Sequence, residues 1–119
     1  MKRLMLKIRT AMANTAVSVI DMEGELDIVS TPDFEALLQD LFSQKRYKLV
    51  LNMKNLLYVS SNGFGAIESV IRDVRGNDGD IKFANVDPHV YEIIQILEFH
   101  KIFQILKTED EAVRAFSKK

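Results

Sequence analysis

The feature that most restricts how this chain can fold is a run of strand-forming residues, YKLVLNM, from Tyr47 to Met53. The centre of this run is continuously apolar instead of alternating between apolar and polar residues, which is typical of a strand covered on both faces. Segments with apolar residues at helical spacing lie on either side of it. A buried strand between two amphipathic helices is the repeating unit of α/β layer proteins, so we expect that class of fold.

Four further strands are predicted from the apolar pattern. Residues 4–8 alternate between apolar and charged or flexible side chains, and the segment from Ala16 to Met22 follows a turn at TAMANT. A hairpin is the simplest pairing for these two strands. The remaining two strands are expected at Ile81 to Val86, after a turn at GNDGD, and at Ile102 to Leu106.

Four amphipathic helices are predicted from apolar residues that recur at helical spacing. The residues that mark their ends are Thr31 as N-cap and Pro32 as first residue of the first helix, Ser61 and Gly76 for the second, Val90 and Leu97 for the third, and Thr108, Glu111 and Phe116 for the fourth. Thr108 and Glu111 have the spacing of a capping box.

The order of these elements is β-β-α-β-α-β-α-β-α, which predicts one α/β domain spanning residues 1–119. We expect a mixed, mainly parallel five-strand sheet with about four helices. A chain of 119 residues that is 47% hydrophobic can bury one core but hardly two. In such sheets the loops at the carboxyl ends of the strands carry the functional sites.

Composition excludes several classes of function. Sixteen basic and 17 acidic residues give a net charge of −1, and no block of like charge indicates binding to nucleic acid or to an anionic membrane. The absence of cysteine excludes disulfides, thiolate metal sites and cysteine nucleophiles. The N-terminus resembles a signal peptide, but Lys7 and Arg9 interrupt its apolar stretch. We therefore expect a soluble, cytoplasmic protein.

The stretch YVSSNGFG, at residues 58–65, places polar and flexible residues where a strand gives way to a helix. Ser60 and Ser61 are suited to cap the helix, because a serine hydroxyl satisfies free N–H groups in a first turn. Each of the two glycines in that turn costs the helix about 1 kcal/mol relative to alanine. Capping by serine does not require either glycine. Close approach of another backbone or of a phosphate does require glycine. From these residues alone, capping and a functional serine both remain open.

Enzyme motifs are not completed in this stretch. Neither serine has a glycine two residues before it, as G-x-S-x-G requires, and GFGAIE completes neither a Walker loop nor a dinucleotide fingerprint. His89 and His100 are isolated from it in sequence, and no spacing indicates a metal site. We therefore predict no catalytic residue, no metal ligand and no cofactor, with a small α/β enzyme or nucleotide binder as the alternative class.

Three segments resemble one known family. LVLNMKNLLYVSSNGFGAIESVIRDVRGNDGDIKFANV is similar to the central signature of the STAS-domain family of bacterial anti-sigma factor antagonists. GELDIVSTPDF resembles the segment that leads into the first helix of that family, and ANVDPHVYEIIQILEFHKIFQIL resembles its final helix and strand. The resemblance covers nearly the whole chain from Val17 onward, in the same order of elements.

The resemblance implies that Ser61 corresponds to the serine that is phosphorylated in the family. Ser60 stands where the family usually has an aspartate, Asn62 replaces the usual serine or alanine, and Phe64 replaces a leucine. The family's other acid is retained as Asp27. The resemblance implies that an aspartate beside the serine assists the partner kinase, so we expect its replacement by Ser60 to affect how efficiently Ser61 is modified.

By resemblance, the chain is an anti-sigma factor antagonist that binds an anti-sigma factor with serine kinase activity and so releases a sigma factor. The resemblance also implies that phosphorylation of Ser61, with ATP and Mg²⁺ supplied through the partner, ends the interaction and that a PP2C-type phosphatase resets it. The expected contact residues are Asp27, Ser60, Ser61, Asn62, Gly63, Phe64, Gly65, Glu68 and Arg72, with Asp73 on the same side of the helix. The alternative is an unmodified STAS-like scaffold subunit of a transport or signalling complex.

Overall fold

The computed structural model describes residues 3–117, which form one five-strand sheet with the strands in sequence order. β1 (Met5–Thr10) pairs antiparallel with β2 (Val17–Leu26). β3 (Lys48–Val59), β4 (Asp80–Ala84) and β5 (Gln104–Leu106) then follow in parallel. The predicted opening hairpin and the mixed, mainly parallel sheet are both confirmed.

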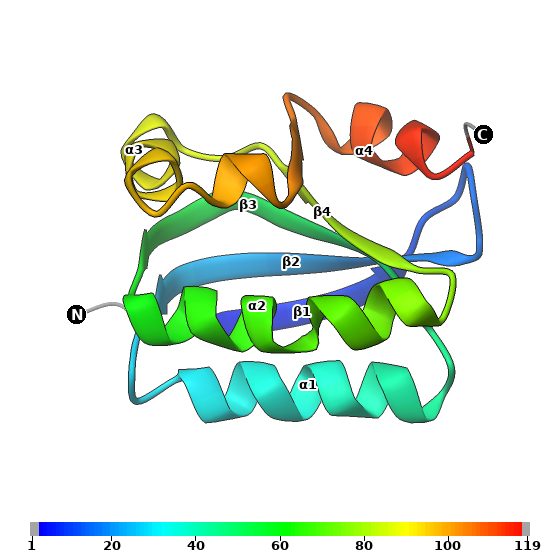
Figure 1. Cartoon of the computed structure of the whole chain (residues 1–119), viewed down its shortest axis with the longest axis horizontal. Coiled ribbons are helices and arrows are strands. Elements are labelled where there is room, and N and C mark those ends of the chain that lie inside the picture. Colours follow the sequence, from blue (N-terminus) through cyan, green and yellow to red (C-terminus); the bar gives the residue numbers. More distant parts are fainter. Residues whose placement is uncertain (1–2, 118–119) are drawn as a thin grey trace.

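Four α-helices and one short 3₁₀-helix pack on this sheet (Figure 1). They are α1 (Thr31–Ser43), α2 (Ser61–Gly76), α3 (Pro88–Ile96), the 3₁₀-helix η1 (Phe99–Lys101) and α4 (Glu109–Ala115). α1 and α2 lie side by side and begin at the same end of the molecule, which is also where β2 and β3 end (Figure 1). The parallel crossovers therefore bring the starts of two helices together.

Two clusters of buried residues hold the layers together. In the larger one, apolar residues of β2 and β3 such as Ile20 and Leu51 share a core with α1 and α2 through Phe34 and Ile67. The smaller one joins the sheet to α4, with Val113 among its members. The sheet is thus covered on both faces, as the continuous apolar run in β3 predicts.

β3 is longer than predicted, because it continues past Met53 to Val59. Lys54 and Asn55 are exposed and interrupt the apolar run, which made the strand look as if it ended there. The pairing with β2 absorbs one extra β3 residue at each of two register shifts, the arrangement of a β-bulge. Only Ser60 then separates β3 from α2.

Two predicted helix ends are wrong in detail. Ser30, not Thr31, is the N-cap of α1, and Thr31 is the buried first residue of the helix, where its hydroxyl donates to the carbonyl of Asp27 at 2.6 Å. Gly76 does not stop α2 but belongs to its last turn. The left-handed residue that follows is Asp78, with φ 61°.

Other predicted features hold. The hydroxyl of Thr108 caps α4 by accepting from the N–H of Glu111 at 3.1 Å. In the GNDGD turn, a Cβ on Gly79 would lie only 2.1 Å from the carbonyl oxygen of Tyr47, so this position has room for glycine alone. The remaining strands and helices differ from their predicted ranges only at their ends.

Candidate functional site

The first turn of α2 is fixed by Ser60. Its hydroxyl accepts from the N–H of Gly63 at 3.2 Å, and its own N–H donates to the carbonyl of Leu26 at 2.8 Å. The first contact is an N-cap, which satisfies one of the free N–H groups at the helix start. The second ties the start of α2 to the end of β2. Ser60 therefore has a structural role at the start of α2.

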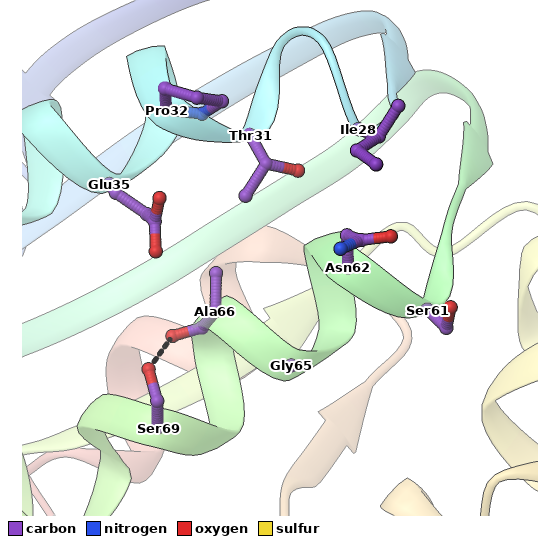
Figure 2. A pocket seen from close by; sticks show the side chains of 9 residues that line it. All are labelled: Ile28, Thr31, Pro32, Glu35, Ser61, Asn62, Gly65, Ala66 and Ser69. Carbon is purple, nitrogen blue, oxygen red and sulfur yellow. Dashed lines mark hydrogen bonds between the residues drawn. The ribbon is translucent and has the colours of Figure 1, made fainter.

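Ser61 is the first residue of α2 and differs from its neighbour. Its side chain is exposed, and its hydroxyl makes no hydrogen bond to any residue between 3 and 117. Figure 2 shows it at the edge of the helix, away from the ribbon of α1. A helix N-terminus favours negative charge, so an anionic group on this hydroxyl is electrostatically tolerated there.

Ser61 lies at one end of an open groove of about 530 Å³ between the first turns of α1 and α2. The residues that line it are Ser61, Asn62, Gly65, Ala66 and Ser69 from α2, and Ile28, Thr31, Pro32 and Glu35 from α1 and the loop before it. In Figure 2, Ile28 and Ser61 lie toward one end of this groove, and Glu35 and Ser69 lie toward the other.

Asp27 organises the loop that leads into α1. Its carboxylate accepts from the N–H of Ser30 at 3.0 Å, from the N–H of Val29 at 3.1 Å, and from the Ser30 hydroxyl at 3.0 Å. These bonds, above all the one from the Ser30 N–H, hold the pKa of Asp27 below its usual value. Asp27 lines a neighbouring cavity with Glu25 and Asp33, not the groove that contains Ser61.

The two glycines of the first turn have different surroundings. A Cβ on Gly63 would lie 2.7 Å from Cγ of Leu26 and 3.0 Å from Cγ1 of Val59, so this glycine lets α2 approach the strand ends closely. A Cβ on Gly65 would meet nothing within 4 Å. Neither residue has positive φ. Packing against the strand ends therefore accounts for Gly63 but not for Gly65.

The other predicted contact residues divide by exposure. Phe64 is buried, with its ring edge-to-face against Phe99 at 5.1 Å between centroids, so it anchors α2 in the core. Asn62 is exposed and lines the groove. Glu68 and Arg72 are exposed on α2 but lie outside the groove lining.

Sequence reasoning missed the α1 wall of the groove. The sequence could have indicated that Glu35 is accessible, because it lies off the apolar face of α1. Ile28 had none that distinguished it from a loop residue, although it is 67% exposed. Ser69 likewise looks like an ordinary polar residue of an amphipathic helix.

The groove presents the hydroxyl of Ser61 and, toward its other end, the carboxylate of Glu35 (Figure 2). Among the described residues that line it there is no histidine, lysine or arginine. His89 and His100 are exposed elsewhere, with His89 4.0 Å from Glu92. Across residues 3–117 we find no group of three or more potential ligands that could hold a metal ion. Within the same residues, no helix has the length and apolar character needed to cross a membrane.

The chain belongs to the STAS domain family, whose model matches residues 9–112. It is 26% identical over 95 residues to BtrV of Bordetella bronchiseptica, named as an anti-sigma factor antagonist, with 80% of this chain and 82% of BtrV covered. It is 28% identical over 99 residues to the anti-sigma F factor antagonist of Paenibacillus polymyxa, covering 82% and 84% of the two chains.

Solved structures show the same fold. A crystal structure of an anti-sigma factor antagonist from Thermotoga maritima superposes with a TM-score of 0.86 at 16% identity, covering 95% of each chain. The Bacillus cell fate determinant SpoIIAA, solved in its phosphorylated form, superposes with a TM-score of 0.66 at 21% identity, covering 92% of this chain and 98% of SpoIIAA.

Proposed function

We propose that this chain is a non-enzymatic regulatory protein, an anti-sigma factor antagonist that binds an anti-sigma factor and thereby releases a sigma factor. The observation that carries the proposal is the exposed, unengaged hydroxyl of Ser61 at the start of α2, beside an open groove. The names of the relatives support the same function. We expect the protein to act in the bacterial cytoplasm and to bind no nucleic acid itself.

The switch in this proposal is phosphorylation of Ser61 by the anti-sigma factor, acting as a serine kinase with ATP and Mg²⁺. A phosphate adds about −1.5 to −2 charges, which disrupt a packed contact by repulsion and desolvation. Within the described part of the chain, the groove lining offers no cation to a phosphate on Ser61, and the switch needs no change of fold. A PP2C-type phosphatase would restore the hydroxyl.

The proposed contact surface is built around the predicted residues. Those whose side chains are accessible are Asp27, Ser60, Ser61, Asn62, Gly65, Glu68 and Arg72. Gly63 and Phe64 take part by holding the first turn of α2 in place, because both are buried. Asp27 takes part through the loop that it stabilises, which carries Ile28 into the groove.

The test uses Ser61→Ala and Ser61→Asp with the anti-sigma factor encoded beside the gene for this chain. We expect Ser61→Ala to bind like the wild type and to resist phosphorylation, because it removes only a hydroxyl. Ser61→Asp should stay folded, since the helix start accepts its charge, and should bind more weakly. The matched control is Ser43→Asp, which places the same charge on an exposed serine at the far end of α1.

Binding is measured by calorimetry, and phosphate is located by mass spectrometry after incubation with ATP. Phosphate on Ser60 alone, or no phosphate with a kinase active on another substrate, would contradict the switch. Undiminished binding by Ser61→Asp would do the same. Those results would favour the unmodified scaffold subunit.

A further inference from the structure

The groove between α1 and α2 has an unusual charge distribution. Among the residues from 3 to 117, nine line this groove, and Glu35 alone of them has a formal charge. Its side chain is exposed and forms no hydrogen bond or ion pair with the residues from 3 to 117. An unpaired carboxylate in a groove without cations repels an acidic segment and attracts a basic one.

Gly65 leaves open space on the α2 side of the same groove. A helical glycine without positive φ is less stable than alanine, and here an added Cβ would meet no atom of the protein within 4 Å. Neither backbone conformation nor internal packing therefore accounts for it. A glycine at this point lets another molecule approach the helix backbone closely.

The opposite end of the groove combines an exposed aliphatic side chain with the polar first turn of α2 (Figure 2). Ile28 is 67% exposed and lies there on the same side as Ser61 (Figure 2). The adjacent Val29 is 80% exposed and lines the neighbouring cavity that contains Asp27. Two consecutive exposed aliphatic residues at a loop tip offer apolar area to a partner. The free N–H groups at the start of α2 also accept negative charge at this end, whereas Glu35 disfavours it at the other.

We propose that the groove binds a partner segment in which an aliphatic side chain contacts Ile28 and a neighbouring arginine or lysine pairs with Glu35. The segment crosses the α2 backbone at Gly65. The partner's contact segment is thus aliphatic and basic, and the biological role of this contact rests on the proposed antagonist function. Phosphate on Ser61 would then be added beside the bound aliphatic side chain, and its charge and hydration would weaken that contact.

The test needs neither the partner nor phosphorylation. The probes are acetyl-leucyl-arginine amide and the corresponding citrulline peptide, which has nearly the same shape without the charge. Titration into ¹⁵N-labelled protein should move the amide resonances of Gly65, Ala66 and Ser69 saturably, with a dissociation constant on the order of millimolar. The citrulline peptide should bind about two- to fivefold more weakly, as for an exposed ion pair.

Glu35→Gln should abolish the difference between the two peptides. The matched control Glu111→Gln, an exposed glutamate on α4, should preserve it. Gly65→Ala should weaken both peptides while leaving the protein folded, because its Cβ has room.

Equal affinity for the two peptides, absence of saturable shifts, or shifts that map outside the groove would overturn the inference. So would loss of the charge preference in Glu111→Gln. Since Ser61 is unmodified throughout, these results are independent of the kinase assay. Failure of the antagonist function and failure of the groove inference are therefore distinguishable.

Discussion

Replacing each glycine of the first turn of α2 by alanine should change stability in opposite directions. Gly65→Ala removes the flexibility of an exposed helical glycine and adds a methyl group where no atom lies within 4 Å. We expect the free energy of unfolding to rise by about 1 kcal/mol, the difference in helix propensity between glycine and alanine. For a domain of this size the melting temperature should rise by about 4 °C.

Gly63→Ala gains part of the same propensity but forces its methyl group to within 2.7 Å of Leu26 Cγ and 2.8 Å of Leu26 Cδ2. Overpacking of this kind costs about 1–3 kcal/mol. Leu26 is fully buried at the end of β2, which limits how far it can move. We expect a net loss of about 1–2 kcal/mol, with part of the strain relieved by displacement of α2.

The measurement is urea unfolding of wild type and both variants, followed by circular dichroism and checked by calorimetry. Gly65→Ala should shift the midpoint upward and Gly63→Ala should shift it downward, with unchanged slopes. If Gly65→Ala is less stable than the wild type, or Gly63→Ala is as stable, then the space around each Cβ does not determine the effect of the substitution. A Gly65→Ala protein that is more stable and also binds its partner normally would show that the partner does not need this glycine.

Three further predictions concern polar residues. Ser60→Ala should lower the free energy of unfolding by about 1 kcal/mol, because the N-cap is lost. Ser60→Asp should keep the cap and speed phosphorylation of Ser61. Equal stability of the two variants would contradict the capping role. Asp27→Asn should slow phosphoryl transfer in a reconstituted kinase assay. The melting temperature should change little, since the amide oxygen of asparagine still accepts hydrogen bonds from the loop N–H groups. An unchanged rate would mean that Asp27 serves only to stabilise the loop. The pKa of Asp21 is lowered, first by its hydrogen bonds from Arg9, so its stabilisation is present above the unfolded value of about 3.9 and is lost as pH falls through the folded value. Acid titration should therefore destabilise the wild type more steeply than Asp21→Asn, and parallel curves would exclude this contribution.

The fold class was readable from the sequence because the signals that specify it are local. The continuous apolar run in β3 and the helical spacing of apolar residues in α1 and α2 each lie within a single segment. The end of β3 was not readable, since Lys54 and Asn55 face solvent and break the pattern. Only pairing with β2 reveals that the strand continues through two register shifts.

The sequence also indicated where the candidate site lies, through the residues that follow β3 and their resemblance to the STAS family. Residue type alone could not separate Ser60 from Ser61, because both are serines at a helix start, and only the resemblance to the STAS family pointed to Ser61. The structure distinguishes the two serines by their hydrogen bonds. Ser60 bonds to the carbonyl of Leu26 and to the N–H of Gly63, whereas the side chain of Ser61 is exposed and bonds to neither.

The sequence by itself therefore determined the order and type of the elements, one buried core and the neighbourhood of Ser61. The tertiary structure decided which glycine is needed for packing, which serine is free, and that Glu35 faces the same groove as Ser61. The physical reason is the range of the interactions. Backbone propensity and apolar periodicity act between residues a few positions apart, whereas the groove exists only where α1 meets α2, two segments brought together by parallel crossovers.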